Sequence, residues 1–290
     1  MQFIYPGEQF TLDSATRKPE NGCFASLPHG VTHYELSGVE ADEAIVLICG
    51  FSVPYYIFDP VFEALRLGGL PVLRYDLLGR GWSDRPRIRY GIEAFLQQLR
   101  ELLDALNINR ASLVGLSMGG PIAASFTARY PTRVRRLVLI DPAGARDLPL
   151  SWFLRLCSLP VLGEMAMLLP GTGAILRAVA RDFFDQSLVA DFLERYRTQM
   201  QFAGFRRALL STLRAGMLES FLETYEEVGM LGLPTLLIWG MEDHTVPFEH
   251  SILIRQAMPH AKFEAIQDAG HVPHYEQPAL VNRVLAEFLQ

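Results

Sequence analysis

The sequence contains few cysteines, and their number and spacing exclude the common cysteine-based sites. Three occur in 290 residues, Cys23, Cys49 and Cys157, and they do not have the spacing of metal ligands. Such an odd and sparse set gives no disulfide framework of the kind that stabilises small secreted domains. We therefore expect a reduced, intracellular protein with a cytoplasmic location and no bound metal.

The chain also lacks a long run of basic residues. It has 26 Lys and Arg against 32 Asp and Glu, so the net charge is −6, and charged residues make up 20% of the sequence. A basic stripe is the usual mark of a nucleic-acid-binding surface, so we expect no nucleic-acid partner. Half of the residues are hydrophobic, which is enough for the core of one large domain, with room for an inserted subdomain.

Long uninterrupted apolar runs are missing as well. The chain starts without a basic segment followed by an apolar one, so we expect no cleaved leader. The most apolar window, residues 148–170, is interrupted by Arg155, Pro160 and Glu164. Because a spanning helix needs about 18 or more consecutive apolar residues, we expect no stable membrane insertion.

Short apolar runs alternate with a helical pattern over the first half of the chain. Four of these runs have the pattern of strands buried on both faces, at residues 44–50, 71–77, 111–117 and 134–141. Between the second and third runs, apolar side chains recur on one face of a helix expected over residues 93–106. This alternation predicts an α/β fold, a mostly parallel central sheet with helices on both faces.

The alternation stops after the fourth strand and resumes after a long gap. Residues 145–232 have helical periodicity and no strand pattern, whereas strands are expected again at 234–240 and 261–270 and helices at 247–258 and 278–290. Such a gap is far longer than an ordinary connection. We therefore predict a core domain made of residues 1–144 and 233–290, interrupted by a helical cap, or lid, at residues 145–232.

One serine occupies the turn between a predicted strand and a predicted helix. Ser117 lies in the stretch SLVGLSMGG, with glycine two positions before it and two and three positions after it. The pattern G-x-S-x-G is typical of a nucleophile elbow, a sharp turn that exposes the serine hydroxyl and leaves no space for bulky neighbours. Since a strand precedes it and a helix follows it, we predict that Ser117 is a nucleophile.

A serine nucleophile needs a base, and the base needs a carboxylate to orient it. Asp243 follows the strand expected at 234–240, and His271 follows the strand expected at 261–270. The resulting chain order of serine, aspartate and histidine is the order expected for this architecture. All three lie just beyond the carboxyl ends of parallel strands, where open α/β sheets bind their ligands.

Five pieces of the sequence, in this order, resemble the α/β-hydrolase fold superfamily, and in particular its serine esterases and lipases. They are ICGFS, YDLLGRGWSD, GLSMGG, WGMEDHTVP and AGHVPHYEQP. The resemblance covers nearly the whole chain from about residue 22, and the helical insertion is similar to the family's lid. It implies a carboxylesterase or a monoacylglycerol-lipase-like enzyme with the catalytic triad Ser117, Asp243 and His271.

The family pattern also favours particular residues where two neighbouring residues could serve as base or acid. It places the base directly after a glycine, which favours His271 over His274, and its spacing after the strand favours Asp243 over Glu242. Asp141, at the end of the strand expected at 134–141, stays open as an alternative acid, because some family members carry the acid there.

The resemblance further implies an oxyanion hole made by the backbone N–H groups of Phe51 and Met118. Before the glycine of this oxyanion loop the family usually has a histidine, whereas this chain has Cys49. The departure removes a side chain that commonly supports the loop. We expect Cys49 to be a buried small residue, since buried structural cysteines are inert.

The implied reaction is hydrolysis of carboxylic esters with short- to medium-chain acyl or aryl groups, through an acyl-enzyme on Ser117 and without a cofactor. The implied partner is a small-molecule ester, and Ser52, Trp152, Val246 and Val272 are assigned to its pocket. Hydrolysis of a carbon–carbon bond in a vinylogous diketone, and cofactor-free perhydrolysis or lyase chemistry, stay open with the same triad. The sequence lacks the clustered arginine and asparagine that would favour the first of these. A ligand receptor without catalysis is an alternative of another class.

Overall fold

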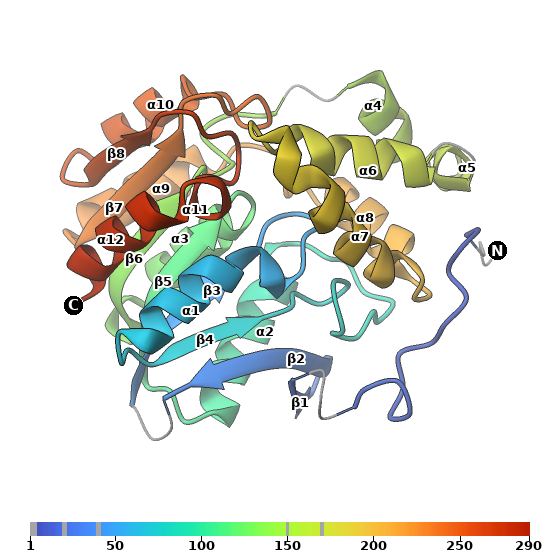
Figure 1. Ribbon diagram of the computed structural model, residues 1–290, viewed down its shortest axis with the longest axis horizontal. Helices are drawn as coiled ribbons and strands as arrows, with labels where there is room; N and C mark the ends of the chain where they lie inside the picture. The colour runs from blue at the N-terminus through green and yellow to red at the C-terminus, as the bar shows by residue number, and fades with distance from the viewer. Residues whose placement is uncertain (1–4, 19–21, 39–41, 149–150, 169–170) are drawn as a thin grey trace.

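A single sheet forms the centre of the structure, which is a computed structural model that describes residues 5–18, 22–38, 42–148, 151–168 and 171–290. The sheet has eight strands in the order β1-β2-β4-β3-β5-β6-β7-β8 (Figure 1). The strands are β1 (Cys23–Leu27), β2 (Gly30–Ser37), β3 (Glu43–Ile48), β4 (Val72–Tyr75), β5 (Arg110–Leu116), β6 (Val134–Ile140), β7 (Thr235–Gly240) and β8 (Lys262–Ile266).

The strands from β3 to β8 pair in parallel, which confirms the predicted mostly parallel sheet. Each of the six predicted strands is present, with ends that differ from the prediction by a few residues. The antiparallel hairpin of β1 and β2 was not predicted. Most of its residues are exposed or half-buried, so the hairpin lacks the continuous apolar run by which the other strands were found.

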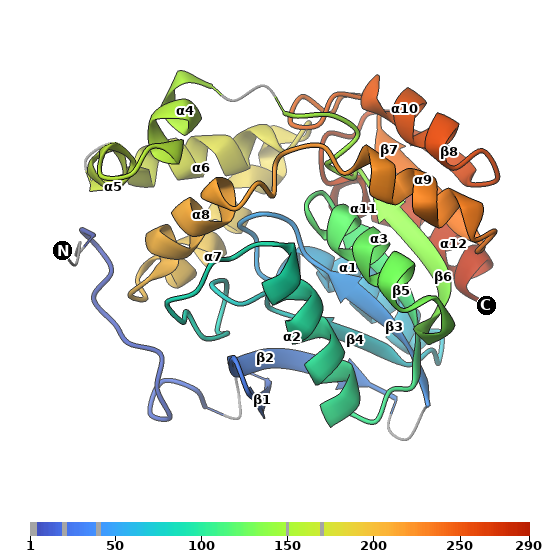
Figure 2. The same ribbon diagram turned by 180° about the vertical axis from the view of Figure 1, so that it is seen from behind.

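Helices cover both faces of the sheet. One face carries α1 (Asp59–Leu67), α11 (Pro273–Glu276) and α12 (Pro278–Leu289), seen in front in Figure 1. The other face, in front in Figure 2, carries α2 (Ile92–Ala105), α3 (Gly119–Arg129), α9 (Leu222–Met230) and α10 (His250–Ala257). Alternate strand residues enter the two hydrophobic cores, with Ile45 and Leu47 on the first face and Val46 and Ile48 on the second.

The described part of the segment between β6 and β7 consists of helices joined by loops and contributes no strand to the sheet. It contains α4 (Trp152–Ser158), α5 (Leu162–Leu168), α6 (Gly171–Arg181), α7 (Val189–Met200) and α8 (Phe205–Arg214), which lie together beyond one end of the sheet (Figures 1 and 2). We call α4 to α8 the cap. Short 3-10 helices occur at η2 (Tyr55–Phe58), η3 (Pro131–Arg133) and η4 (Gln186–Leu188).

Helix α9 differs from the other helices of the predicted insertion, because it packs against α3 and α10 beside the sheet (Figure 2). Tyr225 and Val228 of α9 are buried in the same hydrophobic core as α3. The Tyr225 hydroxyl donates a hydrogen bond to the carbonyl of Ala143, at 2.6 Å. We therefore propose that the cap ends before α9, whereas the sequence analysis placed its end at residue 232.

An aromatic cluster attaches the cap to the core. Phe192 of α7 is buried, and its ring lies 5.4 Å from Tyr56 and 5.6 Å from Tyr275, both in the core domain. Phe183, in the loop after α6, contacts both Phe192 and Tyr275. The cap is thus held by its own apolar side chains against the edge of the sheet where the predicted triad lies.

Among the described residues, no single helix is both long and apolar enough to cross a bilayer. Taken as a pair, helices α5 and α6 have the length and apolar composition of a membrane-spanning segment, but the two helices are bent by 83° relative to each other.

Candidate active site

The turn after β5 holds Ser117 in a strained backbone conformation. Its φ is 54°, in the left-handed region that residues other than glycine seldom adopt, and such a conformation costs about 1–3 kcal/mol. Its N–H donates to the carbonyl of Ile140, and its own carbonyl accepts from Ala143, so the turn is fixed against the end of β6. Ser117 is half-buried between fully buried neighbours, as expected for a serine presented at a nucleophile elbow.

The glycines around Ser117 are required because the tight turn leaves no space for side chains at these positions. A Cβ atom on Gly115 would lie 2.3 Å from the carbonyl oxygen of Gly119, and one on Gly119 would lie 2.2 Å from that of Ile48. Real Cβ atoms do not approach backbone oxygens so closely, so neither position accepts a side chain without a backbone shift. The G-x-S-x-G pattern is therefore a packing requirement of the turn in this fold.

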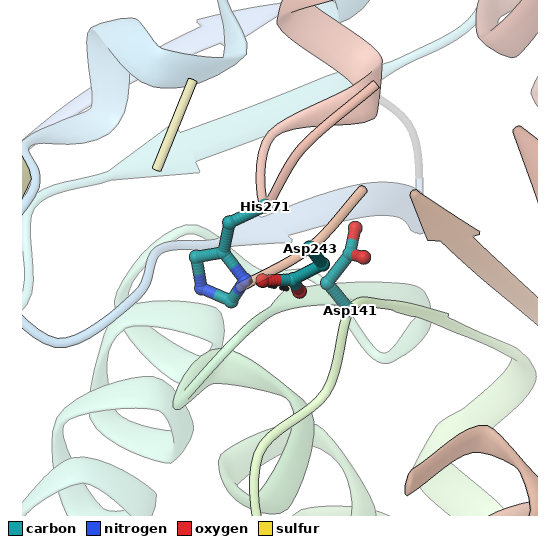
Figure 3. A group of neighbouring side chains, drawn as sticks. All are labelled: Asp141, Asp243 and His271. Atoms are coloured by element: carbon teal, nitrogen blue, oxygen red, sulfur yellow. Dashed lines mark hydrogen bonds and ion pairs between the residues drawn. The ribbon is translucent and has the colours of Figure 1, made fainter. Parts of the chain in front are cut away.

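Asp243 and His271 come together as predicted. Asp243 follows β7, and its Oδ2 lies 2.7 Å from Nδ1 of His271, which follows β8 (Figure 3). The other carboxylate oxygen, Oδ1, accepts the N–H groups of Thr245 at 2.7 Å and Val246 at 2.9 Å. Because these two bonds fix the carboxylate, the imidazole is held with its Nδ1 toward Asp243 and its Nε2 away from it.

The Ser117 hydroxyl itself makes no hydrogen bond to any described residue, His271 included. In enzymes without substrate the hydrogen bond between nucleophile and base is often long and closes only in the complex. Ser117 and His271 are still connected through Asp141 and Asp243. The Ser117 turn makes backbone hydrogen bonds to Ile140 and Ala143, on either side of Asp141. One carboxylate oxygen of Asp141, one of Asp243 and one ring nitrogen of His271 all lie within 4.8 Å of one another.

Asp141, the alternative acid, lies on the far side of Asp243 from His271 (Figure 3). Its Oδ1 accepts the N–H of Gly240 at 2.8 Å, while its Oδ2 is buried without a hydrogen-bond partner among the described groups. Burial, and secondly the charge of Asp243, raise the pKa of Asp141 well above its ordinary value. The direct partner of His271 is Asp243, whose Oδ2 lies 2.7 Å from Nδ1 of the imidazole.

Two opposing effects act on the pKa of His271. Burial alone would lower it, but the charge and hydrogen bond of Asp243 raise it, and so do the charges of Asp182 and Asp141. The carboxylates outweigh burial, so the pKa of His271 lies above its ordinary value of 6.5. Such an imidazole is a strong proton acceptor once it is neutral.

The other rivals are placed elsewhere. His274 is buried, and its Nε2 donates to the carbonyl of Ile57 at 3.1 Å, while burial lowers its pKa to about 3. It is therefore a neutral structural histidine. Glu242 is exposed next to the buried Asp243, so it does not face the imidazole.

The group Asp141, Asp243 and His271 also has the composition of a metal site, since two carboxylates and an imidazole are close together. Three of its ligand atoms are already used, because Asp243 Oδ2 bonds His271 Nδ1 and Asp141 Oδ1 accepts the N–H of Gly240. This bonding is that of an acid–base pair. A metal ion would have to displace these hydrogen bonds.

The predicted oxyanion loop lies against the serine turn. A Cβ on Gly50 would lie 3.3 Å from Cβ of Ser117, so Phe51 directly follows the point of closest approach. Met118, the second predicted donor residue, is buried at the start of α3. Cys49 is fully buried, with its thiol 3.8 Å from the carbonyl of Tyr75, and burial raises the pKa of this thiol well above its ordinary value. These features agree with the expected inert, structural cysteine.

Two residues beside this loop were missed by the sequence analysis. Nε and Nη2 of Arg80 both donate to the carbonyl of Phe51, the former at 2.8 Å. Gln199 of α7 donates from Nε2 to the carbonyl of Ser52 at 2.9 Å. Arg80 lies inside the quoted piece GRGWSD, but nothing in its spacing indicated a contact 29 residues away.

A third missed contact joins the cap to the predicted acid and base. The N–H of His271 donates to the carbonyl of Asp182, at 2.8 Å. The Asp182 carboxylate accepts the hydroxyl of Thr245 at 2.6 Å, and Thr245 in turn donates its N–H to Asp243. These four residues form a closed ring of hydrogen bonds.

The residues assigned to the substrate pocket differ in position and exposure. Ser52 follows the oxyanion loop residue Phe51, and Val272 is buried next to the predicted base. Val246 is fully buried and takes part in the turn that binds Asp243. Trp152 is 77% exposed at the start of α4, so its indole is not enclosed by other residues in this conformation, and its assignment to the pocket stays a prediction.

Comparison with known proteins gives a consistent result. The family model described as alpha/beta hydrolase fold matches residues 43–278. A 2-hydroxy-6-oxononadienedioate/2-hydroxy-6-oxononatrienedioate hydrolase from Paraburkholderia xenovorans is 30% identical over 272 residues, which cover 89% of this chain and 90% of that protein.

Two solved structures are similar over most of their length. A meta-cleavage product hydrolase from Pseudomonas fluorescens IP01 is 27% identical, with a TM-score of 0.75 and coverage of 94% of this chain and 98% of that one. An enol-lactonase from Burkholderia xenovorans LB400 is 25% identical, with a TM-score of 0.76 and coverage of 92% and 99%. From the family match and these likenesses we conclude that the chain belongs to the alpha/beta hydrolase fold family.

Proposed function

We propose that the protein is a serine hydrolase that transfers the acyl group of a carboxylic ester to water through an acyl-enzyme on Ser117. The observation that carries this proposal is the buried pair of Asp243 and His271, joined at 2.7 Å, on the sheet edge where the strained Ser117 turn lies. A base held by a carboxylate, on the same sheet edge as a serine presented on an elbow, is the arrangement that activates serine.

In the proposed cycle, His271 Nε2 takes the Ser117 proton as the hydroxyl oxygen attacks the ester carbonyl. Asp243 keeps the proton of the neutral imidazole on Nδ1 and stabilises the imidazolium that forms. The imidazolium then gives its proton to the leaving alcohol, and the acyl-enzyme forms. Water, deprotonated by the same imidazole, releases the acid and restores the hydroxyl.

The N–H groups of Phe51 and Met118 are the proposed oxyanion hole. Their support is the closeness of Gly50 to Ser117 and the position of Met118 at the start of α3. A donor of this kind lowers the barrier by about 3–4 kcal/mol, because it meets charge that develops only in the transition state.

We infer an ester with an apolar acyl part, of short to medium chain length or aryl. Phe183 follows Asp182, whose carbonyl binds the N–H of His271, and its ring packs with Phe192 and Tyr275. Apolar and aromatic side chains therefore lie close to the base, as is usual for small-molecule pockets. A small-molecule substrate and a cytoplasmic location stay predictions.

Hydrolysis of a carbon–carbon bond is the second candidate, and the similarity to enzymes named as hydrolases of ring-cleavage products favours it. The same acid, base and serine would serve, with a ketone carbonyl in place of the ester. The similarity to an enol-lactonase, which by its name acts on a cyclic ester, favours the first candidate.

A paired assay tests the two candidates. Wild type and Ser117→Ala are given p-nitrophenyl esters of increasing acyl length and, separately, a vinylogous 1,5-diketone acid of the ring-cleavage type. We expect ester turnover with a maximum at short or medium length, and its loss in Ser117→Ala. Turnover of the diketone alone would replace the first candidate by the second. Turnover of neither, by a folded protein, would favour the receptor alternative.

A further inference from the structure

Arg80 is a completely buried cation beside the proposed oxyanion loop. Its side chain is 0% exposed, and its guanidinium donates to the carbonyl of Phe51 from both Nε and Nη2. Nη2 also donates to the hydroxyl of Thr212 at 2.9 Å, and Nη1 donates to the carbonyl of Leu78 at 3.2 Å. Every acceptor in this set is neutral.

No carboxylate of the described residues forms an ion pair with Arg80. Two of the other three buried arginines have one, since Arg74 pairs with Glu35 and Arg206 pairs with Glu8. Desolvation lowers the pKa of Arg80 to about 10, so it stays charged at pH 7. A buried charge without a counter-ion is unfavourable, and such groups gather where a protein needs a fixed field.

The position of this charge relates it to the proposed reaction. The carbonyl that Arg80 binds belongs to Phe51, the same residue whose N–H is the proposed oxyanion donor. From ordinary backbone dimensions, the guanidinium therefore lies within about 7 Å of that N–H group. In a buried, low-dielectric environment a positive charge at this range favours a negative oxygen at the oxyanion hole.

A second contact fixes the next peptide of the loop. Gln199, on α7 of the cap, donates from Nε2 to the carbonyl of Ser52 and accepts the N–H of Gly81 at its Oε1, at 3.0 Å. Gln199 is buried. The loop is thus held at two consecutive carbonyls, and Gly81, which follows Arg80 in the chain, is bound by the same glutamine.

The side chain of Cys49 makes no hydrogen bond to any described residue that would support the oxyanion loop. Its buried thiol is near the carbonyl of Tyr75 and has no other hydrogen-bond partner among the described residues. The loop therefore loses the support that a histidine commonly gives at this position and gains one from Arg80, which comes from the segment after β4.

We propose that Arg80 is a positioning residue that fixes the oxyanion loop through the Phe51 carbonyl, and that its unpaired charge stabilises the oxyanion formed there. The inference rests on the proposed function, since it assumes that Phe51 donates to the reacting oxygen. It assigns to Arg80 a role in the transition state and none in binding the ground-state ester.

The test compares Arg80→Met and Arg80→Lys with the matched variant Arg85→Met. Arg85 is also buried without an ion pair to a described residue, and it donates to the carbonyls of Gly79, Gly81 and Gln199. It makes no bond to the oxyanion loop. The measurements are kcat and KM for p-nitrophenyl butyrate and the inhibition constant of butylboronic acid, which forms a tetrahedral, anionic adduct with an active serine.

For Arg80→Met we expect kcat to fall about 10- to 100-fold, less than the loss of a whole oxyanion donor. The boronic acid should bind more weakly by a similar factor, while KM should change little. Arg80→Lys should restore part of both losses, because the charge returns without the paired donors. Arg85→Met should leave kcat and the boronic acid affinity near those of wild type.

Circular dichroism first checks that each variant is folded, and if Arg80→Met is not, Arg80→Lys decides. Unchanged kcat and boronic acid affinity in a folded Arg80 variant would overturn the inference. So would equal losses in Arg85→Met, since they would indicate a general packing effect. If the boronic acid fails to inhibit wild type, the proposed function itself is wrong, and the inference falls with it.

Discussion

Replacing Asp243 by asparagine separates the role of its charge from that of its shape. Oδ1 of Asp243 accepts two backbone N–H groups, from Thr245 and Val246, and Oδ2 faces Nδ1 of His271. An asparagine keeps its carbonyl oxygen toward the two N–H groups, so its NH₂ group must face the imidazole. An NH₂ group only donates, so the imidazole would be held as the tautomer with its proton on Nε2, which cannot accept the Ser117 proton.

The magnitude follows from this geometry. A base held in the wrong tautomer lowers kcat by about 10⁴, as in the serine protease triad, which corresponds to about 5 kcal/mol of barrier. The fold should survive, because both backbone donors stay satisfied. We expect the free energy of unfolding to change by less than about 3 kcal/mol, the upper range for one hydrogen bond to a charged group.

The matched control is Asp141→Asn, at the end of β6. Burial, and secondly the charge of Asp243, raise the pKa of the Asp141 carboxyl well above its ordinary value, which favours its neutral form. An asparagine has nearly the same shape as the aspartate and the same charge as its neutral form, and it keeps the hydrogen bond from the N–H of Gly240. We expect kcat to stay within about fivefold of wild type, equivalent to about 1 kcal/mol.

The assay is kcat/KM on the best ester, with thermal unfolding measured in parallel. A loss in Asp141→Asn as large as that expected for Asp243→Asn would move the acid role to Asp141. Retention of activity within tenfold in Asp243→Asn would refute the tautomer argument altogether.

Three further outcomes are expected. Because neighbouring carboxylates raise the pKa of His271 more than burial lowers it, kcat/KM should rise with pH to a midpoint above 6.5, and a midpoint below that value would contradict the assignment. Asp182→Asn removes one of these charges, and since Asp182 is half-buried the midpoint should fall by only about half a pH unit; an unchanged profile would exclude its influence. Gly119→Ala places a Cβ 2.2 Å from a backbone oxygen of β3, so it should lower the free energy of unfolding by about 3 kcal/mol or more. The control Gly91→Ala, whose Cβ would have its nearest contact at 3.4 Å, should be tolerated. Equal melting temperatures of the two variants would contradict the packing argument.

The part of the fold that was predicted from sequence is the part with a local pattern. The strands from β3 to β8 belong to the parallel part of the sheet, and most are buried on both faces, so they appear as continuous apolar runs. The hairpin of β1 and β2 is largely half-exposed at the edge, and its mixed pattern gave no such signal. Helix α9 has helical periodicity like the cap, and only its packing against α3 reveals that it belongs beside the sheet.

The candidate site likewise contains residues that a local sequence pattern predicts and residues that only the packed structure reveals. Ser117, Asp243 and His271 each follow a strand in a short motif, so their place on one edge of the sheet could be predicted before any contact was known. Arg80 and Gln199 act on loops 29 and 147 residues away in the chain. No spacing rule connects such pairs, because the contacts exist only once distant segments of the chain have packed together, and the Gln199 contact also requires the cap to pack on the core.

The exposure of Trp152 could not be predicted from the sequence for a related reason. Aromatic and apolar composition favours burial, but composition does not say which side of a cap helix faces the core. In this structure the indole packs edge-on against Phe153, with ring centroids 6.0 Å apart, and is otherwise open to solvent.

The most direct test of the central claim is mass spectrometry of the intact protein, quenched in acid within the first turnovers of p-nitrophenyl butyrate. The account predicts a transient species heavier by one butyryl group, located on the peptide that contains Ser117 and absent from Ser117→Ala. Ester turnover by Ser117→Ala at a rate close to wild type, with no acyl adduct on either protein, would contradict it.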